Sequence, residues 1–157
     1  RGIPAAADVL IAKQDPASQR VAKWLHLKEG EPAYFIKRLF RANGEPVAVQ
    51  ESWWPSDVGL ALVQANLAGE QLLRVLADEL GIYIGEAEAT IEAGAATAEE
   101  ASLLLVRTGS PVLVLKRVDY CTDGRPVVSE RLVFRADKYK YQARQVRNPQ
   151  RRVGDWA

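Results

Sequence analysis

The feature that most constrains the fold of this chain is a segment that occurs twice. Residues 22–38 and residues 101–117 share alanine, leucine, glycine, proline and a closing Lys-Arg pair at the same spacing. Each copy continues into an Asn-Gly or Asp-Gly turn, so each predicts a helix end, a Gly-x-Pro corner, a strand and a hairpin. Two hairpins with matching corners can build one sheet, and each brings an arginine, Arg38 or Arg117, to the same point.

Composition limits the class of protein. The chain has 157 residues, of which 48% are hydrophobic and 26% charged, which is typical of a single globular domain. The net charge of +1 does not favour a surface that binds nucleic acid. No apolar run is long enough to span a membrane, so we expect no membrane partner. Cys121 is the only cysteine, which excludes an internal disulfide and favours a cytoplasmic location.

Local signals predict an alternation of strands and helices. Because the chain begins at Arg1 and contains no methionine, we expect it to be a piece of a longer protein, with residues 1–7 as a linker. Residues 142–157 turn basic and lose periodicity, which indicates a solvated tail rather than a nucleic-acid arm. The expected elements are a strand at 9–12, a helix from an N-cap at Asp15 to Gly30, strands at 33–41 and 46–54, helices at 57–66 and 70–80, a strand at 82–95, a helix from an N-cap at Thr97 to about 106, and strands at 111–120 and 125–134.

No motif of catalysis is visible. The sequence has no Cys/His cluster, no glycine-rich phosphate loop and no G-x-S-x-G elbow, and its single histidine, His26, is expected to be an ordinary surface or packed residue. We therefore expect no catalytic residue, no metal site and no cofactor. The absence of catalytic motifs favours a binding module over an enzyme.

Polar residues on the strands are the more specific signal. A charge buried without a partner costs several kcal/mol, so Arg38 either reaches solvent or Glu51, or lines a cavity and meets a polar ligand. With a two-residue turn, Arg38 lies opposite Val49 and shares a face with Glu51. With a three-residue turn, it lies opposite Ala48 and shares a face with Gln50. The sequence decides neither the role of Arg38 nor the length of the turn.

For other aromatic and polar residues on the strands, the sequence likewise does not decide which face of the sheet each side chain occupies. Trp53 and Trp54 are adjacent, so they point to opposite faces, and either can be core or a stacking wall for a ligand. The polar set of the second hairpin is Arg117, Ser129, Glu130 and Arg131.

Four segments in the right order resemble the UTRA domain, the effector-binding domain of GntR-type bacterial transcription regulators of the HutC subfamily. Residues 38–50, R-L-F-R-A-N-G-E-P-V-A-V-Q, resemble its R-L-R-x-A-[D/N]-G-x-P-x-x-x-E signature. Residues 134–141, F-R-A-D-K-Y-K-Y, resemble its closing [Y/F]-R-x-D-[R/K]-Y-x-[F/Y]. The helix at 72–81 and the unit of helix, glycine and proline at 98–111 also agree, and the match covers residues 8–141.

The resemblance implies a chorismate-lyase-like α/β (α+β) fold, with a mostly antiparallel sheet of about six strands and helices packed on it. It implies ligand sensing rather than catalysis, a homodimer, and DNA binding through an N-terminal winged helix-turn-helix domain that this chain lacks. Effectors of the family include sugar phosphates, amino sugars, urocanate and other small acids. The alternatives are a chorismate-lyase-type enzyme and a dimerisation module with a vestigial pocket.

The resemblance also implies that Arg38 and Tyr139 contact the effector. Phe40 replaces a second arginine and Gln50 replaces a glutamate, which weakens the case for a phosphate ester or an amino sugar and favours a monocarboxylate. A segment upstream of Arg1 contributes backbone N–H groups in the family, so we expect part of the pocket to be missing. The expected effector site comprises Arg38, Phe40, Gln50, Glu51, Trp54, Arg117, Ser129 and Tyr139.

Overall fold

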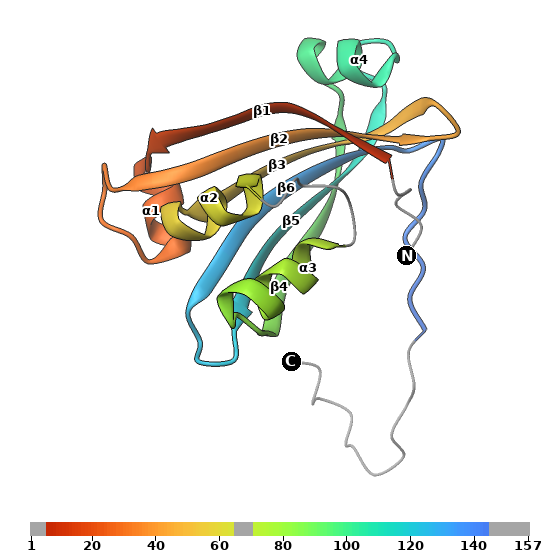
Figure 1. Ribbon diagram of the computed structural model, residues 1–157. Helices are drawn as coiled ribbons and strands as arrows, with labels where there is room; N and C mark the ends of the chain where they lie inside the picture. The colour runs from red at the N-terminus through yellow and green to blue at the C-terminus, as the bar shows by residue number, and fades with distance from the viewer. Residues whose placement is uncertain (1–5, 65–70, 145–157) are drawn as a thin grey trace, which may run out of the picture.

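The computed structural model describes residues 6–64 and 71–144, which form one antiparallel sheet with helices on both faces (Figure 1). The six strands lie in the order β1-β2-β3-β6-β5-β4. This confirms the expected α+β class with an open antiparallel sheet. No helix in the described ranges has the length and apolar character to cross a membrane. The strands are β1 (Ala6–Pro16), β2 (Pro32–Ala42), β3 (Glu45–Pro55), β4 (Ile84–Ala95), β5 (Pro111–Cys121) and β6 (Pro126–Arg135), and the helices are α1 (Gln19–Leu25), α2 (Ser56–Gln64), α3 (Gln71–Leu80) and α4 (Ala98–Leu104).

The repeat in the sequence is a repeat in the structure. The unit β1-α1-β2-β3 recurs as β4-α4-β5-β6, and the two hairpins meet where β3 pairs with β6. The helix caps match as well. Ser18 and Thr97 are the N-caps of α1 and α4, while His26 and Leu105 end these helices in the left-handed conformation. The prediction of two matching halves of one sheet is confirmed.

The start and the end of α1 differ from the prediction. Asp15 and Pro16 are the last residues of β1, because the pairing of β1 with β2 continues to Pro16. The helix begins after Ser18, whose hydroxyl accepts a hydrogen bond from the N–H of Val21. It ends at Leu25, not at Gly30, which forms part of the turn that leads into β2.

The expected linker and tail overlap only partly with the described residues. Residues 6 and 7 of the expected linker belong to β1, and residues 1–5 lie outside the described part of the chain. Of the expected tail, residues 145–157 also lie outside the described part of the chain. In α3, the side chains of Leu72 and Leu73 lie outside it as well.

Each face of the sheet carries two apolar clusters. We call the face covered by α2 and α3 the front face and the face covered by α1 and α4 the back face (Figure 1). On the front face, Val58 and Leu62 of α2 pack on Ile36 and Trp54. On the back face, Leu104 of α4 packs on strand residues of both hairpins, and α1 packs in a separate cluster. Polar side chains occupy the strip between the clusters on each face.

The N-terminus of α4 tests how much a single cap contributes. The hydroxyl of Thr97 accepts a hydrogen bond from the N–H of Glu100, and the Glu100 carboxylate accepts one from the N–H of Thr97. We expect Thr97→Ala to lower the free energy of unfolding by about 1 kcal/mol, because two N–H groups lose their acceptors or their alignment. Urea denaturation measures this loss. Ser102→Ala, at an exposed position of the same helix, is the control, and equal losses in the two variants would contradict the role of the cap.

Candidate functional site

A chain of polar side chains crosses the centre of the front face, from β2 to β5. Arg38 donates from Nε and NH2 to the Oε1 atom of Gln50, at 2.8 and 2.6 Å. The Gln50 amide donates to Oε2 of Glu130 at 2.5 Å, and the other oxygen of Glu130 lies 2.6 Å from NH2 of Arg117. Arg117 Nε is 3.0 Å from Oδ1 of Asp119, but the two are not aligned for a hydrogen bond. One arginine from each half of the repeat therefore enters the same network.

The register of the first hairpin places Arg38 directly opposite Gln50. The turn has two residues, Asn43 and Gly44, both with positive φ. The pairing then shifts beyond Phe40, which leaves Val47 as an extra residue in β3. Both predicted pairings of Arg38, with Val49 and with Ala48, are therefore wrong, because the hairpin combines a two-residue turn with a bulge.

Burial shifts the pKa values of the ionisable groups in this network. Arg38, Gln50 and Glu130 are only 6, 6 and 7% exposed. Loss of solvent raises the pKa of Glu130, and the Arg117 guanidinium opposes that shift. Burial likewise raises the pKa of Asp119, again opposed by Arg117. The pKa of Arg38 is lowered by burial and supported by Glu130.

Two buried donors of the network have no hydrogen-bond acceptor within the described part of the chain, Nε of Arg117, which still lies in ion-pair range of Asp119, and NH1 of Arg38. NH1 of Arg38 is buried and makes no hydrogen bond within the described part of the chain. A guanidinium presents its donors in a fixed fork that suits carboxylates and phosphates. The network therefore offers a buried, cationic N–H group to an anion.

Aromatic side chains border this donor. The Arg38 guanidinium lies 5.1 Å from the centre of the Phe40 ring, in cation–π contact. Phe40 belongs to a cluster with Phe134, and the ring of Tyr139 stacks on Phe134 at a centroid distance of 4.0 Å. A polar strip and an apolar surface thus meet at Arg38.

The structure separates the predicted site residues into two groups. Arg38, Phe40, Gln50, Arg117 and Tyr139 lie on the front face, in or beside the polar network. Trp54 is on the same face but in the core beneath α2, where its indole N–H donates to Ser52 at 2.9 Å. Glu51 and Ser129 lie on the back face, opposite Arg131 and Trp53.

Sequence reasoning left Glu130 and Asp119 out of the predicted site. Glu130 was visible as a polar residue of the second hairpin, and its place in the repeat corresponds to Gln50 in the first. Each of these two residues lies directly opposite the arginine of its own hairpin. Superposing the two copies of the repeat could have found Glu130, whereas Asp119 has no polar counterpart in the first copy.

Potential metal ligands do not gather in this region. Within residues 6–64 and 71–144, no group of three or more His, Cys, Asp or Glu side chains is placed to hold a metal ion. The network consists of hydrogen-bond donors and acceptors with balanced charge, which suits binding of a polar ligand.

Comparison with known proteins identifies the family. The family model of the UTRA domain matches residues 1–140. The chain is 33% identical, over 144 residues, to the HTH-type transcriptional regulator Rv0792c of Mycobacterium tuberculosis, covering 90% of this chain and 52% of that protein. It is 30% identical, over 110 residues, to the HTH-type transcriptional repressor NagR of Bacillus subtilis, covering 68% and 43%. The chain thus spans about half the length of these relatives or less.

Solved structures agree on the fold. The ligand-binding domain of a protein classed with the GntR-family regulators, from Bordetella bronchiseptica, superposes with a TM-score of 0.81 at 28% identity, over 90% of this chain and 91% of that one. The effector domain of PhnF from Mycobacterium smegmatis gives a TM-score of 0.83 at 21% identity, over 90% and 86%. With four sequence motifs, the fold and the family model in agreement, the chain belongs to the UTRA domain family.

Proposed function

We propose that this chain is the effector-sensing part of a GntR-type transcription regulator of the HutC subfamily. A small molecule bound at Arg38 would control DNA binding by a winged helix-turn-helix domain outside this chain. The proposed full protein is a cytoplasmic homodimer and not an enzyme. The names of the relatives support this role, since one is a transcriptional regulator and another a transcriptional repressor.

The unpaired NH1 of Arg38 is the observation that carries the proposal. A buried donor without an acceptor is costly, and an anionic group of a ligand would remove that cost. Phe40 occupies the position of a second arginine in the family signature, so Arg38 has an aromatic ring rather than another guanidinium beside it at that position. We propose a small monocarboxylate whose apolar body packs against Phe40.

Calorimetry with urocanate, glucosamine and glucose 6-phosphate tests this choice of ligand. We expect urocanate to bind best of the three, and Arg38→Gln to weaken it by about tenfold or more, since a charge-assisted hydrogen bond is lost. Arg41→Gln is the matched control, because Arg41 is on the same strand but pairs with Asp8 in an exposed position. Tight binding of glucose 6-phosphate that Arg38→Gln leaves unchanged would overturn the proposal. If none of the three raises the melting temperature, a dimerisation module with a vestigial pocket becomes the better account.

One feature favours a second candidate, a chorismate-lyase-type enzyme. Such an enzyme requires two arginines and a glutamate, and Arg38, Arg117 and Glu130 lie in one network here. Release of pyruvate from chorismate distinguishes the candidates. Turnover that is abolished by Glu130→Gln would establish the enzyme.

A further inference from the structure

The back face carries a groove of about 580 Å³. It is lined by α1 and by four neighbouring strands, β3, β6, β5 and β4. Its lining includes Trp24, Trp53, Ser129, Lys116 and Arg131. Arg117 and Glu130 of the Arg38 network are also among the lining residues, whereas Arg38, Phe40 and Gln50 are not. Neither the proposed effector site nor the core of the domain accounts for its mixture of aromatic and charged groups.

Two tryptophans give the groove its aromatic surface. Trp53 of β3 is half-buried, and its ring packs against Phe35 at a centroid distance of 4.6 Å. Trp24 of α1 is also half-buried, with the Arg20 guanidinium 5.0 Å from its ring centre. Ser129, which is opposite Trp53 on the next strand, is buried in the floor. A flat organic ring can pack on such surfaces with little loss of its own conformational entropy.

A pair of like charges lies beside this aromatic surface. Along one row of the sheet, Lys37, Glu51 and Arg131 alternate in sign, but Lys116 is directly opposite Arg131 on β5. Like charges that face each other across two strands destabilise a sheet. The alternation of charge therefore breaks at Lys116 and Arg131.

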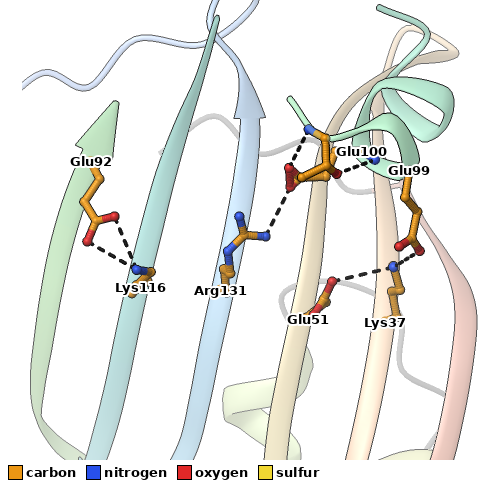
Figure 2. A network of polar contacts seen from close by, with 8 residues as sticks. Lys37, Glu51, Glu92, Glu99, Glu100, Lys116 and Arg131 are labelled. Carbon is orange, nitrogen blue, oxygen red and sulfur yellow. Dashed lines mark hydrogen bonds and ion pairs between the residues drawn. The ribbon is translucent and has the colours of Figure 1, made fainter. Parts of the chain in front are cut away.

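The carboxylates that neutralise this pair approach from its two sides (Figure 2). Glu100 of α4 contacts Arg131 at 3.2 Å, and Glu92 of β4 contacts Lys116 at 3.3 Å. The contact between Lys116 and Glu92 is exposed, and such pairs contribute little. An anion between the two cations would relieve their repulsion and keep both outer contacts.

We propose that the back-face groove binds a small aromatic carboxylate. Its carboxylate lies between Lys116 and Arg131, and its ring packs against Trp53 and Trp24. The groove is open to solvent, so binding requires no rearrangement of the sheet. The four residues proposed to contact this ligand are not among those proposed to contact the effector.

Titration of the protein with benzoate, followed by NMR, tests the proposal, with benzamide as the neutral probe of the same shape. We expect benzoate to shift the indole N–H signals of Trp24 and Trp53, and benzamide to bind about tenfold more weakly or worse. Lys116→Gln should weaken benzoate by a similar factor, because it removes one cation and leaves the aromatic surface. Lys116 is exposed, so this variant should keep the melting temperature of the parent within a few degrees.

Arg38→Gln is the matched control for the opposite face, and it should leave benzoate binding at the tryptophans unchanged. Equal binding of benzoate and benzamide, or benzoate binding that Lys116→Gln leaves intact, would overturn the proposal. So would a result in which Lys116→Gln changes only the self-association of the protein in sedimentation, because the groove would then be a contact between copies.

Discussion

Replacing Gly59 by alanine is expected to lower the free energy of unfolding by about 3 kcal/mol, within the range for overpacking at a rigid contact. A Cβ atom at this position would lie 2.1 Å from Cβ and 2.6 Å from Cγ of Tyr34. The backbone of Tyr34 fixes its Cβ atom, so no change of rotamer can remove the 2.1 Å contact. The helix α2 would have to shift off β2, and Val58 and Leu62 would lose part of their packing on the sheet.

Helix propensity alone predicts the opposite sign, since alanine is favoured over glycine by about 1 kcal/mol inside a helix. Leu60→Ala, at the next and exposed position, is the control and should change stability by about 0.5 kcal/mol or less. Urea denaturation of both variants decides between the two effects. A Gly59→Ala variant as stable as the parent would show that α2 does not approach β2 as closely as the structure indicates.

The repeat allowed half of this fold to be predicted, because both of its copies use local signals. Thr97 has a glutamate three residues later and two acidic residues in the first turn, and α4 begins there as predicted. In the first copy, the corresponding Ser18 is preceded by Asp15-Pro16, which is an equally good start signal. Tertiary pairing decided against that signal, since β1 gains partners on β2 as far as Pro16. Local rules cannot weigh a cap against a long-range strand pair.

The arrangement of the site was less predictable, because one extra residue in a hairpin changes which side chains face each other. The bulge at Val47 has no distinctive sequence and determines that Arg38 meets Gln50. The amide at position 50, a departure from the family signature, also has a physical reason that only the second hairpin provides. Glu130 needs a donor, and a glutamine can accept from Arg38 while it donates to Glu130.

Gln50→Leu is therefore expected to lower the free energy of unfolding by about 3 kcal/mol, the cost of leaving a buried charge without its partner. Leucine is similar in size, so little of this loss comes from a cavity. Arg38 would lose the acceptor of two N–H groups, and Glu130 would lose one donor. Val49→Ala, the adjacent position on the back face, is the packing control, and its loss should not depend on pH.

Gln50→Glu keeps the acceptor for Arg38 but removes the donor to Glu130, and it makes the stability of the protein depend on pH. The new carboxylate still accepts from Arg38 but faces Glu130 without a proton to donate, so at pH 8 we expect a loss of about 2 kcal/mol. Burial already raises the pKa of Glu130, and a second carboxylate raises it further. An acid whose pKa is higher in the folded than in the unfolded state stabilises the fold when protonated. That contribution is complete below the unfolded pKa of about 4.3 and is lost as the pH rises through the folded pKa. The difference in stability between Gln50→Glu and the parent should therefore shrink as the pH falls from 8 to 5. Urea denaturation of both proteins at several pH values measures this difference. If the difference stays constant from pH 8 to pH 5, the two carboxylates do not share a proton. The amide at position 50 is then not needed as a donor.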